Sequence, residues 1–565
     1  MTTACPALPA SVAPGEAPPK RRLPVLSVAA LLNEQQSLTA VERFAKLHED
    51  PASSLKERIY RDLVPLERPQ AGEQYAFEVD LDACTGCKAC VAACHNMNGL
   101  DPGELWRNVG LLHGGSAAAP AVRTVTSSCH HCLEPACLLG CPTRAYEKDP
   151  VTGIVKHLDD QCFGCEYCTL MCPYDAPKYN RARGIVRKCD MCSARLASGE
   201  APACVQACPN EAIAIRIVEQ AAVIENADAH HFLPGAPAPD QTLPTTVYKS
   251  QRPMPGNLLP ADFYTTRPEH GHPPLVVMLT LTQLSAGAFA LDLLVDRLSG
   301  APAGDPLAQT LVATSLALLA LAASVFHLGR PWLAWRAVLG LRTSWLSREA
   351  VAFGLFAKLA IAYGLLRALP LFGFDALGSQ LLPLARRLHE AAALLGLVGV
   401  SCSVMVYVAT RREQWSATHT GVRFFGTTIL LGAAAVFAVS ALTTAAPGAS
   451  GVIPIALLGL IAVTATLKAA FELRALGHRS DRRHSALKRV ATVMLGDLRA
   501  LTALRFAALS AGVVLPTLLL LGDLGATAVG VISVLMLVLV TFAELLERYA
   551  FFRAAPASRM PGALK

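Results

Sequence analysis

Sixteen of the eighteen cysteines in this chain of 565 residues lie in one stretch, between Cys84 and Cys208. They form four groups of four, the last of them stretched in its middle: 84–94, 129–141, 162–172 and 189–208. Such regular spacing indicates an internal repeat. We expect a brief helix after the last cysteine of a group. We also expect short strands in the flanking segments rich in Val, Ile and Thr, at 75–80, 121–126, 153–158 and 212–218.

The third group favours iron–sulfur clusters over zinc. Structural zinc takes four ligands in a tetrahedron, usually from two separated C-x-x-C pairs. Cys162, Cys165 and Cys168 instead form C-x-x-C-x-x-C, and Cys172 with Pro173 follows. This is the run of bacterial ferredoxins, in which the fourth cysteine ligates the second cluster. A disulfide framework is typical of short secreted chains, and this chain is long. Four such groups therefore predict four 4Fe–4S clusters.

The crossing of each fourth cysteine to the neighbouring cluster predicts the complete ligand sets. The second group pairs with the third, and the first pairs with the fourth, so that one ferredoxin module is nested inside the other. The predicted sets are Cys84, Cys87, Cys90 and Cys208 for cluster 1; Cys94, Cys189, Cys192 and Cys204 for cluster 2; Cys129, Cys132, Cys137 and Cys172 for cluster 3; and Cys141, Cys162, Cys165 and Cys168 for cluster 4. The metal of each site is iron.

Other residues near the groups have simpler interpretations. His130 and His131 lie inside the second group, where the cysteines already suffice, so we expect a hydrogen-bonding or surface role. We expect Cys402 to be a small apolar residue of a membrane span and Cys5 to belong to the N-terminal tail. Four basic residues are candidates for tuning cluster potentials by their charge, although we favour solvated surface for them: Lys88, Arg144, Lys148 and Lys156.

The second half of the chain consists of long runs of Leu, Ala, Val and Ile. A run of about 20 apolar residues crosses a bilayer as a helix, because the bilayer offers its backbone no other hydrogen-bond partner. We predict eight spans near 274–295, 306–327, 350–370, 389–409, 423–443, 452–472, 503–521 and 525–547.

The loops between the spans predict the orientation. Fourteen basic residues lie in loops on the side of both termini, against four on the other side. The positive-inside rule therefore places the cysteine domain on the cytoplasmic side of a bacterial inner membrane. A partner carrying a twin-arginine signal is the alternative that would export it. The same loops account for the net charge of +7, and no nucleic-acid-binding motif is present.

These observations predict an α+β double bacterial-ferredoxin-like iron–sulfur domain followed by an all-α bundle of eight transmembrane helices. The segment "RRLPVLSVAALL" at 21–32 only superficially resembles an export signal, and we expect a tail leading into a helix near 27–48. We expect an N-terminal tail and helical extension at 1–74 and the iron–sulfur domain at 75–220. A Pro-rich linker or strap follows at 221–272, then the membrane domain at 273–552 and a C-terminal tail at 553–565.

The first 220 residues resemble the iron–sulfur subunit of DMSO reductase-type molybdoenzymes. The resemblance is carried by "CHHCLEPACLLGCPTRAYEKDPVTGIVKHLDDQCFGCEYC" and "GIVRKCDMCSARLASGEAPACVQACPNEAI". The second half is similar to the membrane-anchor subunit of that family, through its eight spans and the loop "HLGRPWLAWRAVLGLRTSWLSRE". The resemblance implies that two subunits are fused here. It also implies a large catalytic partner with a molybdenum bis-pterin cofactor, and a membrane quinone as the other electron carrier.

The implied function is electron transfer between membrane quinone or quinol and the molybdenum partner, with the chain as membrane anchor. The direction stays open between reduction of an S- or N-oxide, as in anaerobic respiration, and the reverse, such as sulfite oxidation, which the cytoplasmic orientation favours. The chain is then a non-catalytic subunit whose own half-reaction is at most that of the quinone. The alternatives are a self-contained quinone-linked redox protein without a molybdenum partner, and a scaffold stabilised by its clusters.

His327 and Glu349 are the predicted quinone site. They end the second span and begin the third, on the side of the cysteine domain. Quinol oxidation releases protons, so the site needs groups that accept them. We expect His327 to accept a proton or hydrogen bond from quinol and Glu349 to relay protons, held ionised by Arg330 and Arg348. The competing interpretation is local: Ser347 caps the third span, and both residues suit the helix dipoles.

Other ionisable residues in the spans rank lower. Lys468 and Glu472 lie one turn apart and are expected to pair. His389 and Glu390 open the fourth span on the opposite side, where they would serve a second quinone site or none. Lys358 lies within the third span.

Overall fold

The computed structural model describes residues 28–37, 62–65, 67–265, 267–444, 452–522, 524–556 and 560. The chain divides into two units, Met1–Arg61 and Asp62–Lys565. The first unit contributes one described helix, α1 (Val28–Ser37), within the segment expected to be helical. Apart from α1, the predicted N-terminal extension is described only from residue 62 onward, and Cys5 and most of the C-terminal tail lie outside the described residues. All the other elements belong to the second unit.

The cysteine domain is closed by its first and last strands. β1 (Glu73–Asp80) pairs antiparallel with β8 (Ile213–Glu219), from Glu73 opposite Glu219 to Val79 opposite Ile213. β1 therefore precedes the first cysteine group and β8 follows the fourth, which brings those two groups together around the other two. β9 (Val247–Lys249) adds to the free edge of β1 in parallel. The strap between the domains thus contributes a strand to this sheet.

The remaining strands form three small sheets. β2 (Asn108–Gly115) and β3 (Pro120–Ser127) make a hairpin, and β10 (Leu259–Pro260) of the strap pairs with β2. The other two sheets are the pairs β4 (Tyr146–Lys148) with β5 (Val155–His157) and β6 (Lys178–Asn180) with β7 (Ile185–Arg187). All four segments expected to be strands contain one: β1, β3, β5 and β8.

Short helices begin within the cysteine groups rather than after them. In each group the third cysteine lies in the first turn of a helix. The fourth group has an additional helix that begins directly after its second cysteine. These helices are α4 (Ala89–Met97), α5 (Ala136–Gly140), α6 (Tyr167–Met171), α7 (Ser193–Ala197) and α8 (Ala203–Gln206). Beyond β8 follow α9 (Gln220–Asp228) and a 3₁₀ turn at Pro239–Gln241.

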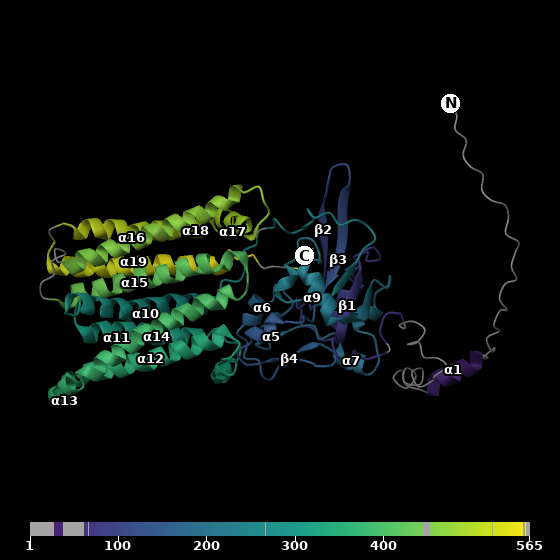
Figure 1. Cartoon of the computed structure of the whole chain (residues 1–565), viewed down its shortest axis with the longest axis horizontal. Coiled ribbons are helices and arrows are strands. Elements are labelled where there is room, and N and C mark those ends of the chain that lie inside the picture. The colour runs from purple at the N-terminus through teal and green to yellow at the C-terminus, as the bar shows by residue number, and fades with distance from the viewer. Residues whose placement is uncertain are drawn as a thin grey trace, which may run out of the picture. The chain divides into compact units, whose positions relative to one another are not determined.

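Eight helices in the described residues are long and apolar enough to cross a membrane, which confirms the predicted bundle. Asp305 and Ser416 cap two of them through their side chains, and proline occupies the first turn of others. The eight are α10 (Pro273–Ser299), α11 (Pro306–Val325), α12 (Trp345–Ala368), α14 (Leu382–Val408), α15 (Ala417–Thr443), α16 (Val452–Leu476), α18 (Arg499–Leu520) and α19 (Ala526–Arg553). They run side by side in Figure 1.

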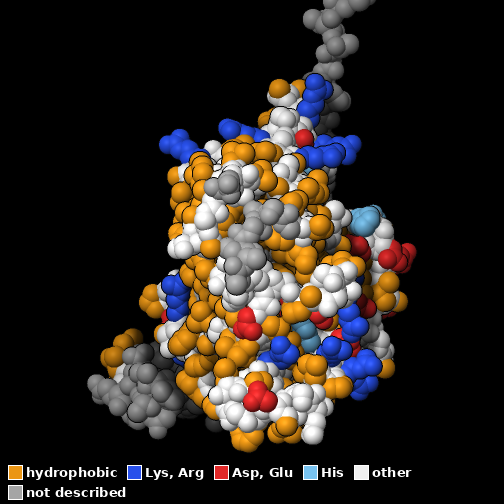
Figure 2. Space-filling view, turned by 90° about the vertical axis from the view of Figure 1, so that its left-hand side faces the viewer, with side chains coloured by type: hydrophobic (Ala, Val, Ile, Leu, Met, Phe, Trp, Pro, Cys, Tyr) orange, Lys and Arg blue, Asp and Glu red, His pale blue; other side chains and the backbone are white. Residues whose placement is uncertain are grey.

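Shorter elements connect the membrane helices. They are the helices α13 (Asp375–Gln380) and α17 (Ala486–Leu495), and the 3₁₀ helices η3 (Pro331–Val338), η4 (Leu369–Phe372), η5 (Glu413–Trp415) and η6 (Gly477–Ser480). The end of the bundle seen in Figure 2 is largely apolar, with scattered charged side chains. Large apolar side chains are also exposed along the helices, such as Leu311, Leu467 and Leu535, as suits helices that face lipid.

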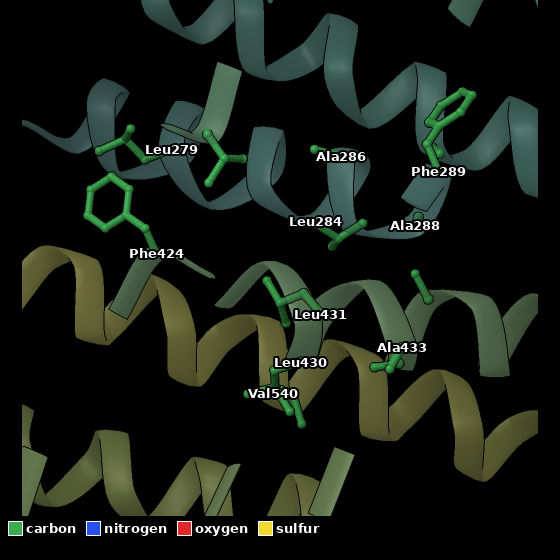
Figure 3. Close-up of a cluster of buried hydrophobic side chains, with 14 of the residues drawn as sticks. Leu279, Leu284, Ala286, Ala288, Phe289, Phe424, Leu430, Leu431, Ala433 and Val540 are labelled. Atoms are coloured by element: carbon green, nitrogen blue, oxygen red, sulfur yellow. The ribbon is translucent and has the colours of Figure 1, made fainter. Parts of the chain in front are cut away.

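The core of the bundle lies around α10, which packs against α11, α14, α15 and α19. Figure 3 shows Leu279 and Leu284 of α10 facing Phe424 and Leu431 of α15. The two helices touch through glycine: a Cβ on Gly432 would lie 2.7 Å from the Cα of Gly287. Small residues of this kind let membrane helices approach closely, because lipid supplies no hydrophobic force between them.

The connecting loop, residues 326–344, joins the bundle to the second and third cysteine groups. The backbone N–H of Arg330 donates to the carbonyl of Phe163 (3.0 Å), and that of Gly340 donates to Pro142 (2.7 Å). The Ser344 hydroxyl donates to the carbonyl of Gly140 (2.7 Å). The connection between the second and third spans is therefore bonded to the second and third cysteine groups.

Candidate functional site

The sixteen cysteines gather into four neighbourhoods. Within each, the thiols lie close enough to influence one another's charge. Neighbourhood 1 contains Cys84, Cys87, Cys90 and Cys208; neighbourhood 2 contains Cys94, Cys189, Cys192 and Cys204; neighbourhood 3 contains Cys129, Cys132, Cys137 and Cys172; and neighbourhood 4 contains Cys141, Cys162, Cys165 and Cys168. Every neighbourhood draws on two cysteine groups.

These sites fit iron–sulfur clusters in the chemistry of their donors. Burial raises the pKa of Cys94 to about 12 and that of Cys172 to about 11. A thiolate at such a position needs a metal to stabilise its charge. Backbone N–H groups also point at sulfur, at 3.2 Å for Ala145 to Cys141 and for Ala212 to Cys208. Hydrogen bonds to the sulfurs are one of the means by which proteins set cluster potentials.

A repeated backbone turn produces those N–H contacts. The third residue after the last cysteine of three groups has a positive φ: Arg144 (54°), Asp175 (55°) and Glu211 (50°). This left-handed residue turns the chain so that the next N–H faces the cysteine sulfur. Each turn follows a Cys-Pro pair. The repeat noted in the cysteine spacing therefore extends to the residues behind it.

Two buried cations lie between the neighbourhoods, and sequence reasoning missed both. Arg107 is 1% exposed, stands over the ring of Phe77, and interacts with thiols of neighbourhoods 1 and 2. Lys188 is 3% exposed. Its Nζ lies 3.6 Å from the sulfur of Cys129 in neighbourhood 3. The same Nζ donates to the carbonyl of Cys189 in neighbourhood 2 (2.9 Å). The position of Lys188 directly before a cysteine was the signal available.

These contacts give the neighbourhoods a linear order. Thiols of 1 and 2 influence each other through Cys90 and Cys204, and those of 2 and 3 through Cys129 and Cys189. Tyr146, buried at 6% exposure, interacts with thiols of neighbourhoods 3 and 4. The sequence of neighbourhoods is thus 1, 2, 3, 4.

The two histidines of the second group are buried, so a surface role was wrong and a hydrogen-bonding role is confirmed. His130 Nδ1 lies 2.8 Å from the hydroxyl of Thr246, and His131 Nδ1 accepts from the N–H of Val155 (3.1 Å). Lys148 is not simply solvated either, since its Nζ donates to the carbonyls of Cys132 and Leu133. Cys402 is buried in α14, as expected of an apolar residue.

A cavity of about 290 Å³ separates neighbourhood 4 from the membrane helices. His327 and Glu349, predicted as a pair, both line it. Its walls are mostly apolar and come from α6, α10, α11, α12, α14 and the connecting loop; they include Cys165, Tyr167, Phe353 and Tyr407. The cavity therefore places an imidazole and a carboxylate beside a cysteine of neighbourhood 4.

The His327 ring interacts with the backbone of Cys165 in the cysteine domain. Its buried Nε2 has no hydrogen-bond partner among the described residues. Burial lowers the pKa of His327 to about 4, although the bond to Cys165 acts in the opposite direction. The imidazole is therefore neutral at pH 7. It has a nitrogen available for a ligand.

Glu349 is 3% exposed and accepts a hydrogen bond from the hydroxyl of Ser403. The expectation that two arginines hold it ionised was wrong. Arg330 donates to the carbonyl of Asp159 (2.8 Å), and Arg348 donates to that of Arg342 (2.7 Å). Long arginine side chains at a helix end reach loop carbonyls more easily than they reach the buried face of the helix.

The capping alternative also fails for this helix. α12 begins at Trp345, and Ser344 occupies the N-cap position. Ser347 lies in the first turn, with a buried hydroxyl that has no partner among the described residues. Glu349 lies beyond the first turn of α12 and lines the cavity.

The expected pair of Lys468 and Glu472 is absent. Lys468 instead pairs with Glu544 of α19, and Glu472 with Arg505 of α18 (2.6 Å). Helix packing brings opposite charges from other helices closer than the next turn. Together with neighbouring charges these residues form the buried charge network: Arg423, Lys468, Glu472, Arg505, Glu544, Glu547 and Arg548.

The remaining ionisable residues lie away from the cavity. His389 stacks on Tyr363 (ring centroids 4.8 Å apart) and bonds to the carbonyl of Phe289 (3.1 Å). Glu390 pairs with Arg387 (3.1 Å). Lys358 is exposed on the outside of α12. His389 is thus held by its Nε2 hydrogen bond and by the Tyr363 ring.

Comparison with known families agrees with this architecture. A 4Fe-4S dicluster domain matches residues 121–217, and the DMSO reductase anchor subunit (DmsC) family matches residues 270–553. Fold and site together define a membrane-anchored iron–sulfur electron-transfer protein. This protein belongs to the DMSO reductase anchor subunit family, and its anchor is continuous with a half similar to the B subunit of the same reductases.

Several relatives match the iron–sulfur half. The B subunit of the anaerobic dimethyl sulfoxide reductase of Haemophilus influenzae is 35% identical over 189 residues, which is 32% of this chain and 91% of that protein. Its counterpart in Escherichia coli K12 is 38% identical over 148 residues, 25% of this chain and 72% of that protein. The Hydrogenase-2 operon protein HybA of Escherichia coli O157:H7 is 33% identical over 172 residues, 26% of this chain and 52% of that protein.

Proposed function

We propose that each neighbourhood holds one 4Fe–4S cluster, and that the four form a path for electrons between a membrane quinol and a molybdenum-containing partner. Such clusters, when bound, carry one electron at a time. The cysteines of each neighbourhood supply four thiolates, most of them buried, and Arg107, Lys188 and Tyr146 each interact with thiols of two adjacent neighbourhoods. The linear order 1, 2, 3, 4 supports a path rather than four separate structural sites.

The cavity carries the quinol part of the proposal. It is mostly apolar, as suits a quinone ring, and both His327 and Glu349 line it. His327 is the hydrogen-bond partner or proton acceptor of a quinol oxygen, and Glu349 relays protons. Cys165 lies in the same wall, which supports a route in which electrons leave the membrane at the cavity through cluster 4.

The experiment separates the quinol site from the clusters. In His327→Ala and Glu349→Gln, a quinol analogue should no longer reduce the clusters, while dithionite still reduces all of them. Glu390→Gln, at the opposite end of the bundle, is the matched control and should behave as the unaltered protein does. Normal quinol-driven reduction in both cavity variants would overturn the site.

The partner is proposed to dock beside neighbourhood 1. Cys87 is the exposed cysteine there, and Cys84 and Cys208 are partly exposed, whereas nearly all other cysteines are buried. Electron transfer needs short distances, so an exposed end of the path suits an exit to a second protein. Molybdenum that co-purifies with the detergent-solubilised protein would support this partner. If the purified protein is active with quinol but contains no molybdenum, a self-contained redox protein is supported instead.

The direction proposed is quinol oxidation that feeds reduction of an S- or N-oxide, because the relatives are named as reductase subunits. Sulfite-type oxidation with transfer to quinone is the reverse outcome. The proposed location is the bacterial inner membrane, with the iron–sulfur domain on the cytoplasmic side by the count of basic residues. Cleavage of that domain by protease only in right-side-out vesicles would show instead that it is exported.

A further inference from the structure

Three metal-binding side chains converge next to the cavity. Glu166, His272 and His327 each offer a ligand atom, and these atoms all lie within 4.8 Å of one another. They come from three separate segments: Glu166 precedes α6 in the cysteine domain, His272 precedes α10 at the end of the strap, and His327 lies in the connecting loop. The fold, rather than any local motif, brings them together.

Two of the three donors have a nitrogen without a partner. Nδ1 of His272 and Nε2 of His327 are buried and make no hydrogen bond within the described part of the chain. A buried polar atom without a partner is destabilising, so such atoms usually face a ligand, an ion or water. The two rings meet edge to face with centroids 5.2 Å apart, and the His272 ring packs against Phe552 (5.6 Å). The His272 ring is therefore packed between His327 and Phe552 before any ion binds.

We propose that Glu166, His272 and His327 form a binding site for a divalent transition metal, with zinc as the best match. Two imidazoles and one carboxylate are a donor set that zinc takes in proteins, with the fourth position left to water. Magnesium and calcium prefer oxygen ligands alone, so this set discriminates against them. The site would also join the cysteine domain to the bundle, because its ligands belong to both.

The metal and the quinol would compete for one atom. His327 lines the cavity, whereas Glu166 and His272 do not. A metal on Nε2 of His327 removes the nitrogen that the proposed quinol site uses, so bound zinc should inhibit quinol oxidation. This consequence rests on the proposed function; the metal site itself does not. By linkage, a quinone analogue in the cavity should weaken zinc binding by the same factor.

The first test measures binding directly. The full-length protein with its clusters, in detergent, is equilibrated with chelator-buffered zinc, and zinc per chain is measured. We expect one zinc at high affinity, with an X-ray absorption spectrum of nitrogen and oxygen ligands. Glu166→Gln and His272→Ala should each weaken binding by ~100-fold or more, since even a partner behind a metal ligand is worth 10–100-fold in affinity. His270→Ala, at the exposed neighbouring ring (centroid 4.6 Å from that of His272), is the matched control.

No saturable zinc, or zinc bound through sulfur, would overturn the metal site. An unchanged iron content in every sample shows that zinc has not replaced cluster iron. Folding of Glu166→Gln and His272→Ala is checked by normal reduction of their clusters with dithionite, which does not depend on the proposed quinol site.

The second test measures inhibition. Zinc should inhibit quinol-driven cluster reduction in the unaltered protein and spare reduction by dithionite, and Glu166→Gln and His272→Ala should raise the inhibitory concentration at least tenfold. Zinc that binds at this site without inhibiting would overturn the competition. If quinol fails to reduce the clusters even without zinc, the proposed quinol site falls, while the metal site is decided by the binding measurement alone.

Discussion

The hydroxyl of Tyr167, within the third cysteine group, donates a 2.8 Å hydrogen bond to the carbonyl of Val406, near the end of membrane helix α14. Both residues line the cavity. The bond therefore fixes one wall of the proposed quinol site across the boundary between the two halves of the chain.

Tyr167→Phe should loosen that wall without unfolding the protein. A neutral buried hydrogen bond is worth about 1 kcal/mol, so the apparent affinity for quinol should fall by up to roughly fivefold. Dithionite should reduce the clusters as before. Steady-state kinetics with a quinol analogue measure the effect, and Tyr179→Phe, a partly exposed tyrosine of β6, is the control. Equal KM values for the two variants would mean that the bond does not shape the cavity.

Gly329→Ala should separate the cysteine domain from the bundle. A Cβ on Gly329 would lie 2.6 Å from the carbonyl carbon of Gly184. This contact is too close, and only a shift of the backbone can relieve it. Overpacking of this kind costs about 1–3 kcal/mol. We expect a lower midpoint of thermal unfolding and slower quinol-driven reduction. Gly354→Ala, where no atom lies within 4 Å, is the matched control and should leave both unchanged or raise stability slightly.

Cysteine substitutions test the crossing of ligands between groups. Cys172→Ser should alter the same EPR signal as Cys132→Ser, although residue 172 belongs to the third sequence group. Cys141→Ser should likewise alter the same signal as Cys165→Ser. If Cys172→Ser and Cys165→Ser affected one common cluster instead, each sequence group would hold its own cluster and the nested arrangement would be wrong.

Lys188→Met should make clusters 2 and 3 harder to reduce. A buried cation stabilises the more negative reduced state, so its removal lowers the reduction potential. For a charge several ångströms away at an effective dielectric of about 20, the shift is on the order of 100 mV. A redox titration followed by EPR measures it. Lys156→Met, a partly exposed lysine of β5, should shift no potential by a comparable amount.

Lys468→Met should destabilise the membrane half. Lys468 pairs with Glu544 and lies 3.9 Å from Glu547, and all three are buried. Removing one partner of a buried pair leaves an uncompensated charge, at about 3–5 kcal/mol. A lower unfolding midpoint in detergent and a lower yield in membranes should follow. Lys358→Met, on the exposed outside of α12, is the control. Equal midpoints for both variants would show that the network is not stabilising through this lysine.

The sequence predicted the features that depend on spacing and hydrophobicity. C-x-x-C-x-x-C and runs of about 20 apolar residues each leave few structural solutions, so the domain types and the eight spans were predictable. His327 and Glu349 were found because they end and begin adjacent spans, and the structure brings them to one cavity.

Single polar residues were not predictable in this way. Arg107 and Lys188 follow no periodicity, and only folding shows that they are buried between thiols. Lys468 has a suitable neighbour one turn away, yet α19 supplies a closer one. Glu166 and His272 lie more than a hundred residues apart and meet only in the folded protein.

The strap has a consequence for how the two halves stay together. Because β9 extends the sheet of β1 and β10 extends the hairpin of β2 and β3, the segment between the domains is built into the cysteine domain rather than spanning a gap. The halves also touch through the connecting loop. A single proteolytic cut in the strap should therefore leave them associated. The covalent link then matters during biogenesis. Each anchor is made together with its own electron carrier, in a fixed ratio of one to one, and their assembly does not depend on the concentration of a second subunit.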